Sequence, residues 1–289
     1  MKRMGILGPC GTHSEAAAIY LNEILSEKLE LIIYPEIYEV LNAVEDGRVD
    51  CGFVPVENSL EGSVNITLDT LARTENLIVT RELIWPVHNQ LMAQAGLKLE
   101  NIKRIYSHAQ PLSQCREYLR ANFPMVEMCA ASSTAKAAEI AANSDLNEGF
   151  AAICTKRAGE LNGLITIATE IQDNMSNSTR FFEVQQRSKF IPADDEADKV
   201  LIICQIDGTR AGSLCEVLEE FAHRGVNMTR IESRPARTEL GAYIFFFDLE
   251  TNAKAGMLEE SIEAVRQKSI WLKNLGAFPV INAKIQDSC

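Results

Sequence analysis

Residues 185–199 read QQRSKFIPADDEADK and separate two patterned parts of the 289-residue chain. The stretch is polar, contains one proline and an acidic cluster, and has little apolar periodicity, which is typical of a linker. With 46% hydrophobic residues, the chain is long enough for two domains, each with its own core. We therefore predict a first unit at residues 1–185, a linker at 186–198 and a second unit at 199–282.

Before the linker, short apolar runs alternate with amphipathic helical stretches. The runs predict strands at 4–7, 29–34, 51–56, 77–85, 103–108, 150–155 and 179–184. Helices are expected between several of them, at 14–26, 36–46, 111–121, 133–143 and 155–161. This β-α-β-α order predicts an α/β fold with open sheets of mostly parallel strands.

After the linker, the pattern restarts in a different order. The sequence predicts a strand, a helix, a hairpin of two strands, a helix and a last strand, at 199–206, 212–225, 226–235, 240–250, 256–268 and near 275–281. The order β-α-β-β-α-β is ferredoxin-like. A unit of about 80 residues is small for independent stability, so we expect one face of its sheet to pair with a second copy.

The composition argues against several classes of protein. A net charge of −12 and a pI of about 4.9 disfavour nucleic-acid binding, and no apolar run approaches the length of a membrane span. The N-terminal sequence lacks the features of a signal peptide. Eight scattered cysteines without C-x-x-C or zinc spacing indicate reduced thiols, no metal site and a cytoplasmic protein.

Polar residues gather where the predicted strands end. The strands run into GPCGTHSE, ENSLEGS and HAQPLSQC, and the run ending at Ala131 meets SSTAKAA. Alone, each motif is explained as a helix cap or a tight turn, and none is a P-loop or G-x-G-x-x-G. In open α/β sheets, however, ligands bind at these carboxyl ends. Neutral donors and helix N-termini together suit a small ligand that carries a carboxylate.

The strand NSTRFF at 177–182 starts polar and becomes fully apolar. Because side chains alternate along a strand, Thr179 and Arg180 are expected to point to opposite faces. We therefore assign its first residues to a site and its phenylalanines to packing on both faces of a covered sheet.

These residues resemble those of monofunctional prephenate dehydratases over essentially the whole chain. The matching motifs occur in the family's order and spacing: GPCGTHSEAA (8–17), PVENSLEGSV (55–64), SHAQPLSQC (107–115), SSTAKAA (132–138), IQDNMSNSTRF (171–181) and GSLCEVLEEFAHRGVNMTRIESRP (212–235). Family members usually carry an aromatic residue at the position of His13, which could alter packing or pH response near the site.

The resemblance implies a catalytic domain like the type-2 periplasmic binding proteins, with two α/β lobes around a cleft. Lobe one would comprise about 1–76 and 164–185, and lobe two about 77–163. The C-terminal unit would be an ACT domain, a ferredoxin-like regulatory module that binds amino acids. Since nothing helical precedes MGILGPCG, we expect no fused chorismate mutase.

The implied reaction converts prephenate to phenylpyruvate, water and carbon dioxide without a cofactor, which would make the chain a carbon–oxygen lyase. In the family, the threonine of the T-R-F motif is the residue most implicated in chemistry. We expect Thr179 to donate a hydrogen bond to the departing oxygen within a polar network. The resemblance places the substrate among Thr12, Ser14, Asn58, Ser59, Ser107, His108, Gln110, Gln114, Ser132, Ser133, Thr134, Asn177, Arg180 and Phe181. Arg180 could equally bind a substrate carboxylate or pair with an acidic residue and brace the hinge.

The resemblance also implies an allosteric site for an amino acid, most simply phenylalanine, between one subunit and its partner. Its residues would be Gly212, Ser213, Leu214, Asn227, Met228, Thr229, Glu232, Ser233 and Arg234. Alternatively, Glu232, Ser233 and Arg234 merely link two subunits of a homodimer or homotetramer. The sequence does not choose between dimer and tetramer or give the sign of regulation.

Three other functions are weighed against this one. Arogenate is the close alternative substrate, and the sequence does not identify the residue that discriminates it from prephenate. A non-catalytic amino-acid sensor is disfavoured by the intact NSTRF stretch. A secreted solute-binding protein is disfavoured by the missing signal and the cysteine pattern.

Overall fold

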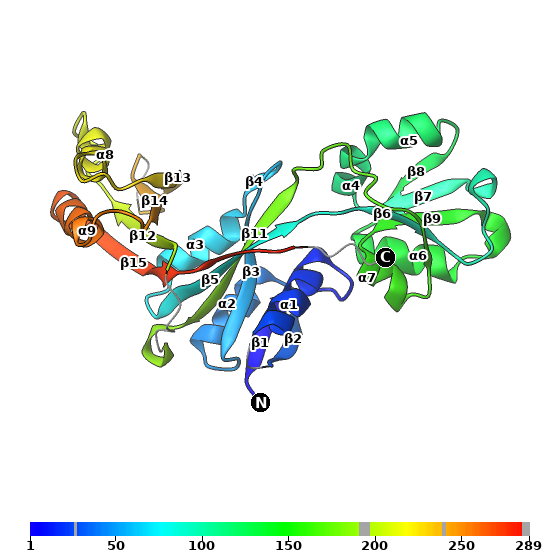
Figure 1. Cartoon of the computed structure of the whole chain (residues 1–289), viewed down its shortest axis with the longest axis horizontal. Helices are drawn as coiled ribbons and strands as arrows, with labels where there is room; N and C mark the ends of the chain where they lie inside the picture. Colours follow the sequence, from blue (N-terminus) through cyan, green and yellow to red (C-terminus); the bar gives the residue numbers. More distant parts are fainter. Residues whose placement is uncertain (26–27, 191–196, 239–240, 285–289) are drawn as a thin grey trace.

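Three sheets lie in a row in the computed structural model, which describes residues 1–25, 28–190, 197–238 and 241–284 (Figure 1). A seven-stranded sheet occupies the middle, a five-stranded sheet one end and a four-stranded sheet the other. The predicted two-lobed α/β fold is confirmed: the first two sheets form the lobes. Residues 199–278 beyond the linker supply the third sheet, whereas 280–282, predicted as part of the same unit, join the central sheet. In the part that is described, no helix is long and apolar enough to span a bilayer.

The central sheet, which forms lobe one, has the strand order β16-β5-β11-β3-β1-β2, with β4 paired to β3. Its strands are β1 (Arg3–Leu7), β2 (Glu30–Tyr34), β3 (Cys51–Asn58), β4 (Gly62–Ser63), β5 (Leu77–Pro86), β11 (Ser178–Gln186) and β16 (Val280–Asn282). Its helices are α1 (His13–Ile24), α2 (Ile37–Glu45) and α3 (Asn65–Arg73). Helix α2 forms because Val40, Leu41 and Val44 recur at helical spacing, and all three are fully buried.

The five-stranded sheet of lobe two has the order β10-β6-β9-β7-β8. Its strands are β6 (Gln90–Ala93), β7 (Arg104–Ser107), β8 (Glu127–Ala130), β9 (Phe150–Cys154) and β10 (Ile165–Ala168). Its helices are α4 (Ala109–Gln114), α5 (Arg116–Asn122), α6 (Thr134–Asn143) and α7 (Lys156–Leu161), and short 3₁₀ turns occur at Leu99–Asn101 and Leu146–Glu148.

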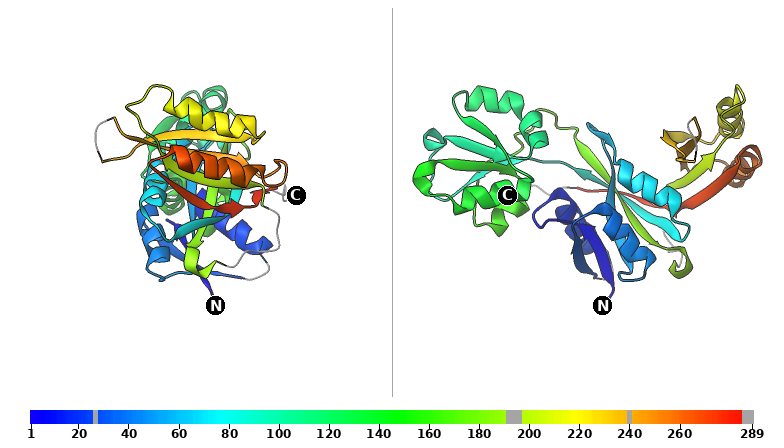
Figure 2. Two further views of the ribbon diagram at one scale, coloured as in Figure 1. Left: turned by 90° about the vertical axis from the view of Figure 1, so that its left-hand side faces the viewer. Right: turned by 180° about the vertical axis from the view of Figure 1, so that it is seen from behind.

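The third sheet has the order β13-β14-β12-β15 and carries two helices on its outer face (Figure 2). The expected β-α-β-β-α-β order is present: β12 (Lys199–Gln205), α8 (Ser213–His223), β13 (Met228–Pro235), β14 (Tyr243–Glu250), α9 (Met257–Lys268) and β15 (Trp271–Phe278). The face without helices packs on lobe one of the same chain, which contradicts the expectation that a second copy covers a face of this sheet. A single apolar cluster includes Val79 and Phe182 of lobe one with Ile203, Phe246 and Phe278 of the third unit.

Several strands run differently from the prediction. Strand β11 pairs antiparallel with both β3 and β5, and β6 pairs antiparallel with β9 and β10. The pairing is therefore mixed rather than mostly parallel. The antiparallel strands are those next to the crossings between the lobes, where the chain leaves one sheet and later returns to it in the opposite direction.

The two crossings also lie elsewhere than at residues 77 and 164. Strand β5 continues in the central sheet to Pro86, and β10 still pairs with β6 of lobe two. The crossing segments run side by side, since Val87 N donates to Asn177 O at 2.9 Å and Ile171 N to Asn89 O at 3.1 Å. The hinge therefore lies at residues 87–89 and 171–177.

The strand expected near 275–281 proves to be two strands in two different sheets. Pro279 separates β15 from β16, and it lacks the N–H that a continued ladder would use. Strand β16 pairs in parallel with β5, with Val280 opposite Glu82. Of the predicted linker, residues 187–189 form a 3₁₀ turn, whereas 191–196 lie outside the described residues.

Candidate functional site

Thr179 lies at the start of β11, where the central sheet meets the hinge. It is opposite Asn58 of β3, and Asn58 Nδ2 donates to Thr179 Oγ1 at 3.0 Å and to Asn177 Oδ1 at 2.9 Å. Asn58 Oδ1 accepts from the backbone N–H groups of Leu60 and Glu61, at 3.0 and 3.1 Å. This turn fixes the amide orientation, so Thr179 accepts from Asn58, and its own O–H donates to no other group among the described residues.

Ser59, in the same turn as Asn58, forms hydrogen bonds to the backbone of the hinge. Its Oγ donates to Ser176 O at 3.3 Å and accepts from Ser178 N at 3.0 Å. Its backbone N–H donates to Ser178 O at 2.9 Å. The structure thus brings together four residues that the sequence assigned to the site: Asn58, Ser59, Asn177 and Thr179.

The loop before α1 closes the other side of this junction. Thr12 caps the helix by accepting from Glu15 N at 3.4 Å, as its sequence position predicts. Gly11 has a φ of +83°, and a Cβ there would lie 2.9 Å from Ala158 of α7 in lobe two. Thr155 Oγ1 donates to Gly11 O at 2.6 Å. The loop therefore contacts both lobes, and Ser14 is buried on the first turn behind it.

His13 is neutral at the junction. Its burial, with a smaller contribution from His88, lowers the pKa of His13 to about 4. Trp85 Nε1 donates to His13 Nδ1 at 3.4 Å, which requires an unprotonated nitrogen there. The residue at the aromatic position of the motif thus behaves as a packed, uncharged ring.

The predicted residues of lobe two lie at its strand ends and helix starts. Ser107 is fully buried and donates to Ile153 O at 2.7 Å, which is a structural role. His108 precedes α4 and Ser133 caps α6 by accepting from Lys136 N at 3.0 Å. Ser132 and Thr134 flank that cap, and Gln110 and Gln114 lie on α4.

Buried polar atoms without a partner concentrate at the same junction. Among the described residues, His13 Nε2, Asn89 Oδ1, Gln114 Nε2 and Asn177 Nδ2 have no hydrogen-bond partner. A buried donor without an acceptor costs about 1–3 kcal/mol. A polar ligand between the lobes would satisfy such donors.

Two predicted substrate contacts are elsewhere. Phe181 is buried and stacks on Phe53, with ring centroids 4.9 Å apart. Arg180 points to the face opposite Thr179 and pairs with Glu57, Glu82 and Asp248. Burial would lower the pKa of Arg180, but Asp248 and Glu82 outweigh burial and raise it above its usual value. Arg180 therefore pairs with acidic residues, as the second of its two expected roles requires, but these partners lie in the central sheet and the third unit and not at the hinge.

The third unit contains a cavity of about 350 Å³ at the start of α8. Gly212, Ser213 and Leu214 line it as predicted, together with Arg210 and Tyr243. Gly212 has a φ of +87°, which permits the tight entry into the helix.

The remaining predicted residues of the third unit do not line this cavity within one chain. They are Asn227, Met228, Thr229, Glu232, Ser233 and Arg234. Two of them face lobe one instead: Glu232 accepts from Ser63 Oγ at 3.0 Å, and Arg234 pairs with Asp69 at 3.0 Å. Alternation along β13 explains this, because Arg230, Glu232 and Arg234 share one face.

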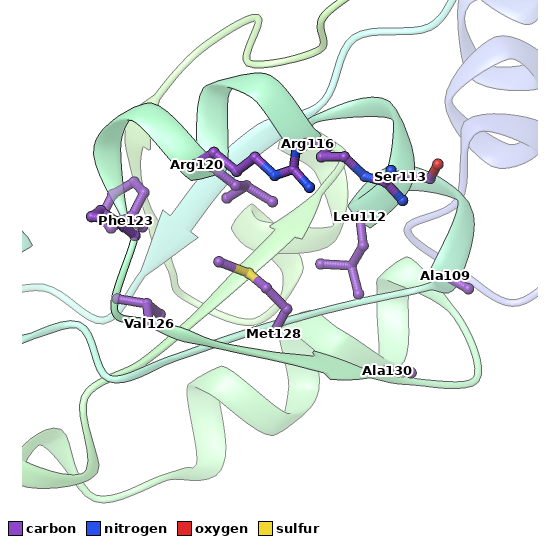
Figure 3. A pocket seen from close by; sticks show the side chains of 11 residues that line it. Ala109, Leu112, Ser113, Arg116, Arg120, Phe123, Val126, Met128 and Ala130 are labelled. Carbon is purple, nitrogen blue, oxygen red and sulfur yellow. The ribbon is translucent and has the colours of Figure 1, made fainter.

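Another cavity, of about 450 Å³, lies on lobe two between α4, α5 and β8 (Figure 3). It has an apolar lining that includes Leu112, Phe123 and Met128, with Arg116 and Arg120 along one side. Thr179 does not line it. Both arginines are exposed, so this cavity is a feature of the outer surface of lobe two.

The sequence missed the residues that join the two lobes. Gly11 and Thr155 form the contact between the loop and α7, and Gln172 Oε1 accepts from Asn89 N at 2.9 Å. Thr155 carried a usable signal, since it follows a predicted strand and begins a helix, as a cap does. Asn89 carried none, because no motif surrounds it.

Known proteins resemble this chain along almost its whole length. A family model described as prephenate dehydratase matches residues 4–189. The bifunctional chorismate mutase/prephenate dehydratase of Pseudomonas aeruginosa is 36% identical over 96% of this chain and 73% of that protein. The prephenate dehydratase of Methanocaldococcus jannaschii is 35% identical over 95% of this chain and 97% of that protein.

A solved structure gives the same result. Prephenate dehydratase from Arthrobacter aurescens, in complex with L-Phe, superimposes with a TM-score of 0.84 at 33% identity, covering 96% of this chain and 90% of that one. The motifs at the strand ends, the polar cluster around Thr179 and the extent of these matches lead to one conclusion: the chain belongs to the prephenate dehydratase family.

Proposed function

We propose that this chain converts prephenate to phenylpyruvate, carbon dioxide and water, in phenylalanine biosynthesis. The observation that carries the proposal is the Thr179 hydroxyl at the junction of the lobes, which accepts from Asn58 and donates to no other group among the described residues. The family relationship supplies the substrate, since the relatives with matching chains are named for this reaction.

The reaction needs positioning more than activation. The bond between the ring and its carboxylate breaks, and its electron pair forms the last double bond of the aromatic ring. The bond to the ring hydroxyl breaks at the same time, and the leaving oxygen takes a proton to become water. One proton from solvent balances the conversion of the prephenate dianion to the phenylpyruvate monoanion. The hydrogen bond from Thr179 stabilises negative charge on the leaving oxygen as it develops.

The other side chains at the junction would bind and orient the dianion. Asn177 Nδ2 and Gln114 Nε2 are buried donors without partners among the described residues, and they suit carboxylate or keto oxygens. The N-termini of α1 and α6 begin in the GTHSE and SSTAKAA motifs and favour negative charge. Ser59 and the Ser132–Thr134 cap would complete this shell.

The decisive test replaces Thr179 by alanine and measures phenylpyruvate by ultraviolet absorbance. Loss of one preorganised donor typically costs 10²–10³ in kcat, or about 2.7–4 kcal/mol. We expect that loss in kcat with nearly unchanged affinity for a product analogue, whereas Thr179→Ser should retain most of the rate. A fall of less than about tenfold contradicts the role of Thr179. Arogenate, assayed in parallel, separates the two substrates.

We further propose that the third unit is an ACT domain that binds phenylalanine. The cavity at Gly212, Ser213 and Leu214 supports this, because the N-terminus of α8 can take a carboxylate. The Arthrobacter relative was crystallised with L-Phe. Calorimetric titration of the full chain with L-Phe tests the proposal. Absence of binding at millimolar L-Phe would contradict the proposed phenylalanine site.

A homodimer or homotetramer completes the proposal. Strand β13 is an edge of the third sheet, and Ile231 on β13 and Tyr243 on β14 are 44% and 46% exposed. An open edge with apolar side chains suits pairing with a second copy. Sedimentation equilibrium distinguishes monomer, dimer and tetramer.

We also propose that the protein is located in the cytoplasm, because all seven described cysteines are unpaired.

A further inference from the structure

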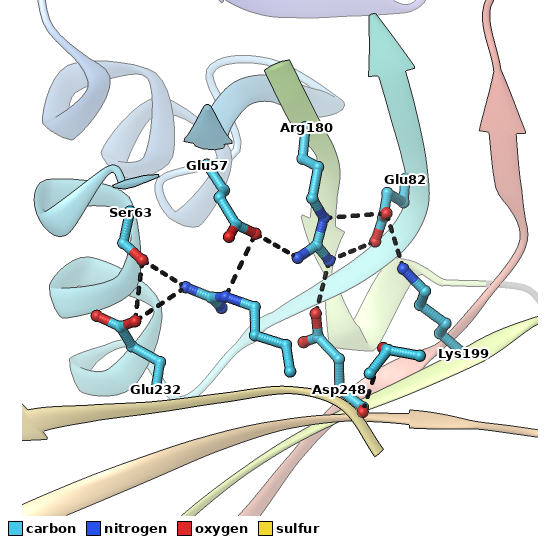
Figure 4. Close-up of polar contacts among 9 residues, drawn as sticks. Glu57, Ser63, Glu82, Arg180, Lys199, Glu232 and Asp248 are labelled. Atoms are coloured by element: carbon cyan, nitrogen blue, oxygen red, sulfur yellow. Dashed lines mark hydrogen bonds and ion pairs between the residues drawn. The ribbon is translucent and has the colours of Figure 1, made fainter. Parts of the chain in front are cut away.

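A network of charged side chains joins lobe one to the third unit on the face of β11 opposite Thr179 (Figure 4). Arg180 is its centre. Its Nη1 lies 2.7 Å from Glu57 Oε2, and its Nη2 lies 2.7 Å from Glu82 Oε2 and 2.6 Å from Asp248 Oδ2. Glu82 and Asp248 are fully buried, so solvent does not screen these contacts.

Two of the three partners belong to lobe one and the third belongs to the third unit. Glu57 and Glu82 belong to β3 and β5, the strands on either side of β11 in the central sheet. Asp248 belongs to β14 of the third unit. If the third unit moved away, Arg180 would keep two carboxylates from its own sheet and would not be left as an unpaired buried charge.

A second arginine lies opposite Asp248 within its own sheet. Arg230 of β13 is directly opposite Asp248, and side chains at such positions have Cβ atoms about 4.5–5.5 Å apart. Arg230 is turned toward lobe one, where its Nε lies 3.3 Å from Glu57 Oε2 and its Nη2 donates to Ser63 Oγ at 2.8 Å.

This arrangement leaves one donor and one acceptor unused. Among the described residues, Arg230 Nη1 and Asp248 Oδ1 are buried without a hydrogen-bond partner. They have complementary charge and lie on adjacent strands, so each could satisfy the other. A direct pairing of Asp248 with Arg230 is therefore an alternative arrangement of this buried network.

We propose that Asp248 exchanges between Arg180 and Arg230, and that this exchange links the position of the third unit to the catalytic strand. With the third unit docked on lobe one, Asp248 anchors Arg180. With the unit displaced, Asp248 pairs with Arg230, and Arg180 keeps only Glu57 and Glu82. Because Arg180 follows Thr179 directly, and the β11–β3 register is irregular after Arg180, a change in its anchoring shifts the catalytic hydroxyl. Arg180 is then a positioning residue.

The inference rests on the proposed regulation by phenylalanine and identifies the element that transmits it. An effector can act only through unequal affinity for two states. The two pairings of Asp248 are two such states. In both, Arg180 keeps at least two carboxylates and Asp248 keeps one arginine, whereas displacement also separates Lys199 of the third unit from Glu82, a pair of 3.0 Å in the docked state.

Two single variants test the exchange in the full-length protein. Asp248→Asn removes the carboxylate that exchanges, and Arg230→Gln removes its alternative partner. For each, kcat/KM for prephenate is measured with and without saturating phenylalanine, and phenylalanine binding is measured by calorimetry. We expect phenylalanine still to bind. Its effect, measured as the ratio of kcat/KM without phenylalanine to kcat/KM with it, should become at least about fivefold closer to one than in the wild type. The double variant should respond like either single variant, because both remove the same exchange.

Further variants separate this role from mere stabilisation. Arg224→Gln removes the ion pair with Glu220 inside α8 and should keep the wild-type response. Arg230→Lys keeps the charge and should give an intermediate response, which also covers the case that a neutral variant does not fold.

The outcomes are distinct. Full phenylalanine response in folded Asp248→Asn and Arg230→Gln overturns the exchange alone. A wild-type protein that forms phenylpyruvate but ignores phenylalanine overturns both the regulation and the exchange. A wild-type protein that forms no phenylpyruvate overturns the proposed reaction instead.

Discussion

The two junctions of lobe one are built in opposite ways. Toward lobe two, the contacts are polar and sparse, and several buried donors and acceptors have no partner among the described residues. Toward the third unit, an apolar cluster is continuous across the boundary and charged groups are multiply paired, with only Arg230 Nη1 and Asp248 Oδ1 unpartnered among the described residues. The polar junction with lobe two can open and accept a polar ligand. The apolar, ion-paired junction with the third unit can instead transmit a displacement of that unit to lobe one. Strand β11 belongs to both.

The largest effect is expected from breaking the apolar junction. Phe182 is fully buried and packs against Phe278 of the third unit, with ring centroids 5.6 Å apart. Phe182→Ala should lower the free energy of unfolding by about 3–5 kcal/mol, measured by chemical denaturation. Phe53→Ala is the matched control, because it removes a buried phenylalanine from the cluster on the other face of the sheet. It should also destabilise the protein, but it should leave any response of the activity to phenylalanine unchanged. A loss below about 1 kcal/mol for Phe182→Ala would contradict a shared core.

At the polar junction, the effect should fall on rate rather than stability. Asn58→Ala removes the donor to Thr179 Oγ1 and to Asn177 Oδ1. We expect kcat to fall about 10²-fold, because the threonine hydroxyl loses its orientation. Ser59→Ala, which removes a contact to the hinge backbone, should cost less. Steady-state kinetics with prephenate would refute the orienting role if Asn58→Ala stayed within about threefold of wild type.

A smaller effect depends on pH. Burial lowers the pKa of His13 from 6.5 to about 4, so the folded state excludes a proton that the unfolded state binds. As pH falls from 6.5 to 4, this group therefore lowers the free energy of unfolding, by about 2 kcal/mol after allowance for partial exposure. His13→Phe should remove this dependence and have no pH-dependent effect above pH 6.5.

The measurement is the difference between wild type and His13→Phe in denaturation experiments at several pH values. His223→Gln, at an exposed position on α8, controls for loss of an imidazole. A difference that does not change between pH 7 and pH 4 would mean that His13 titrates normally in the folded state.

The smallest effect is expected where the lobes touch. Gly11→Ala places a Cβ 2.9 Å from Ala158 at a φ of +83°, so both the backbone and the contact are strained. We expect a stability loss of about 1–2 kcal/mol and a higher KM, because the lobes cannot approach as closely. Gly163→Ala also has a positive φ but meets nothing within 4 Å, so it reports the backbone strain alone. Equal KM values for the two variants would show that the contact with Ala158 does not matter.

The sequence predicted most strands because their apolar runs are buried on both faces. It missed α3, whose sequence NITLDTLAR buries Thr67, Asp69 and Thr70 in place of an apolar stripe. Strands β6 and β10 were also missed; each has four residues, and the equally short β7 was predicted only as part of a longer run at 103–108. The boundary between β15 and β16 depends on which sheet each strand joins, and local pattern does not contain that information.

For the site, alternation predicted that Thr179 and Arg180 diverge, and they do. Local pattern could not identify the partners of Arg180, because Glu82 and Asp248 lie 98 and 68 residues away. Phe181 was predicted both to pack in the sheet, by alternation, and to contact the substrate, by resemblance; its ring is buried against Phe53, so the packing prediction is confirmed and the substrate contact is wrong. Motifs identified the strand ends correctly, and only the fold determines which side of each strand faces the cleft.

Strand β16 gives the third unit a second covalent attachment to lobe one. The chain enters the unit through residues 186–198 and leaves it through Pro279 into a parallel pairing beside Glu82. Because the third unit is attached to lobe one at both ends of its chain, its least restricted motion is a rotation about the line that joins these two attachments. Excising the unit before residue 199 would also remove an edge from the catalytic sheet and expose β5. Under the proposed regulation, the third unit would act on lobe one by a rotation about these two attachments, beside the strand that carries Thr179.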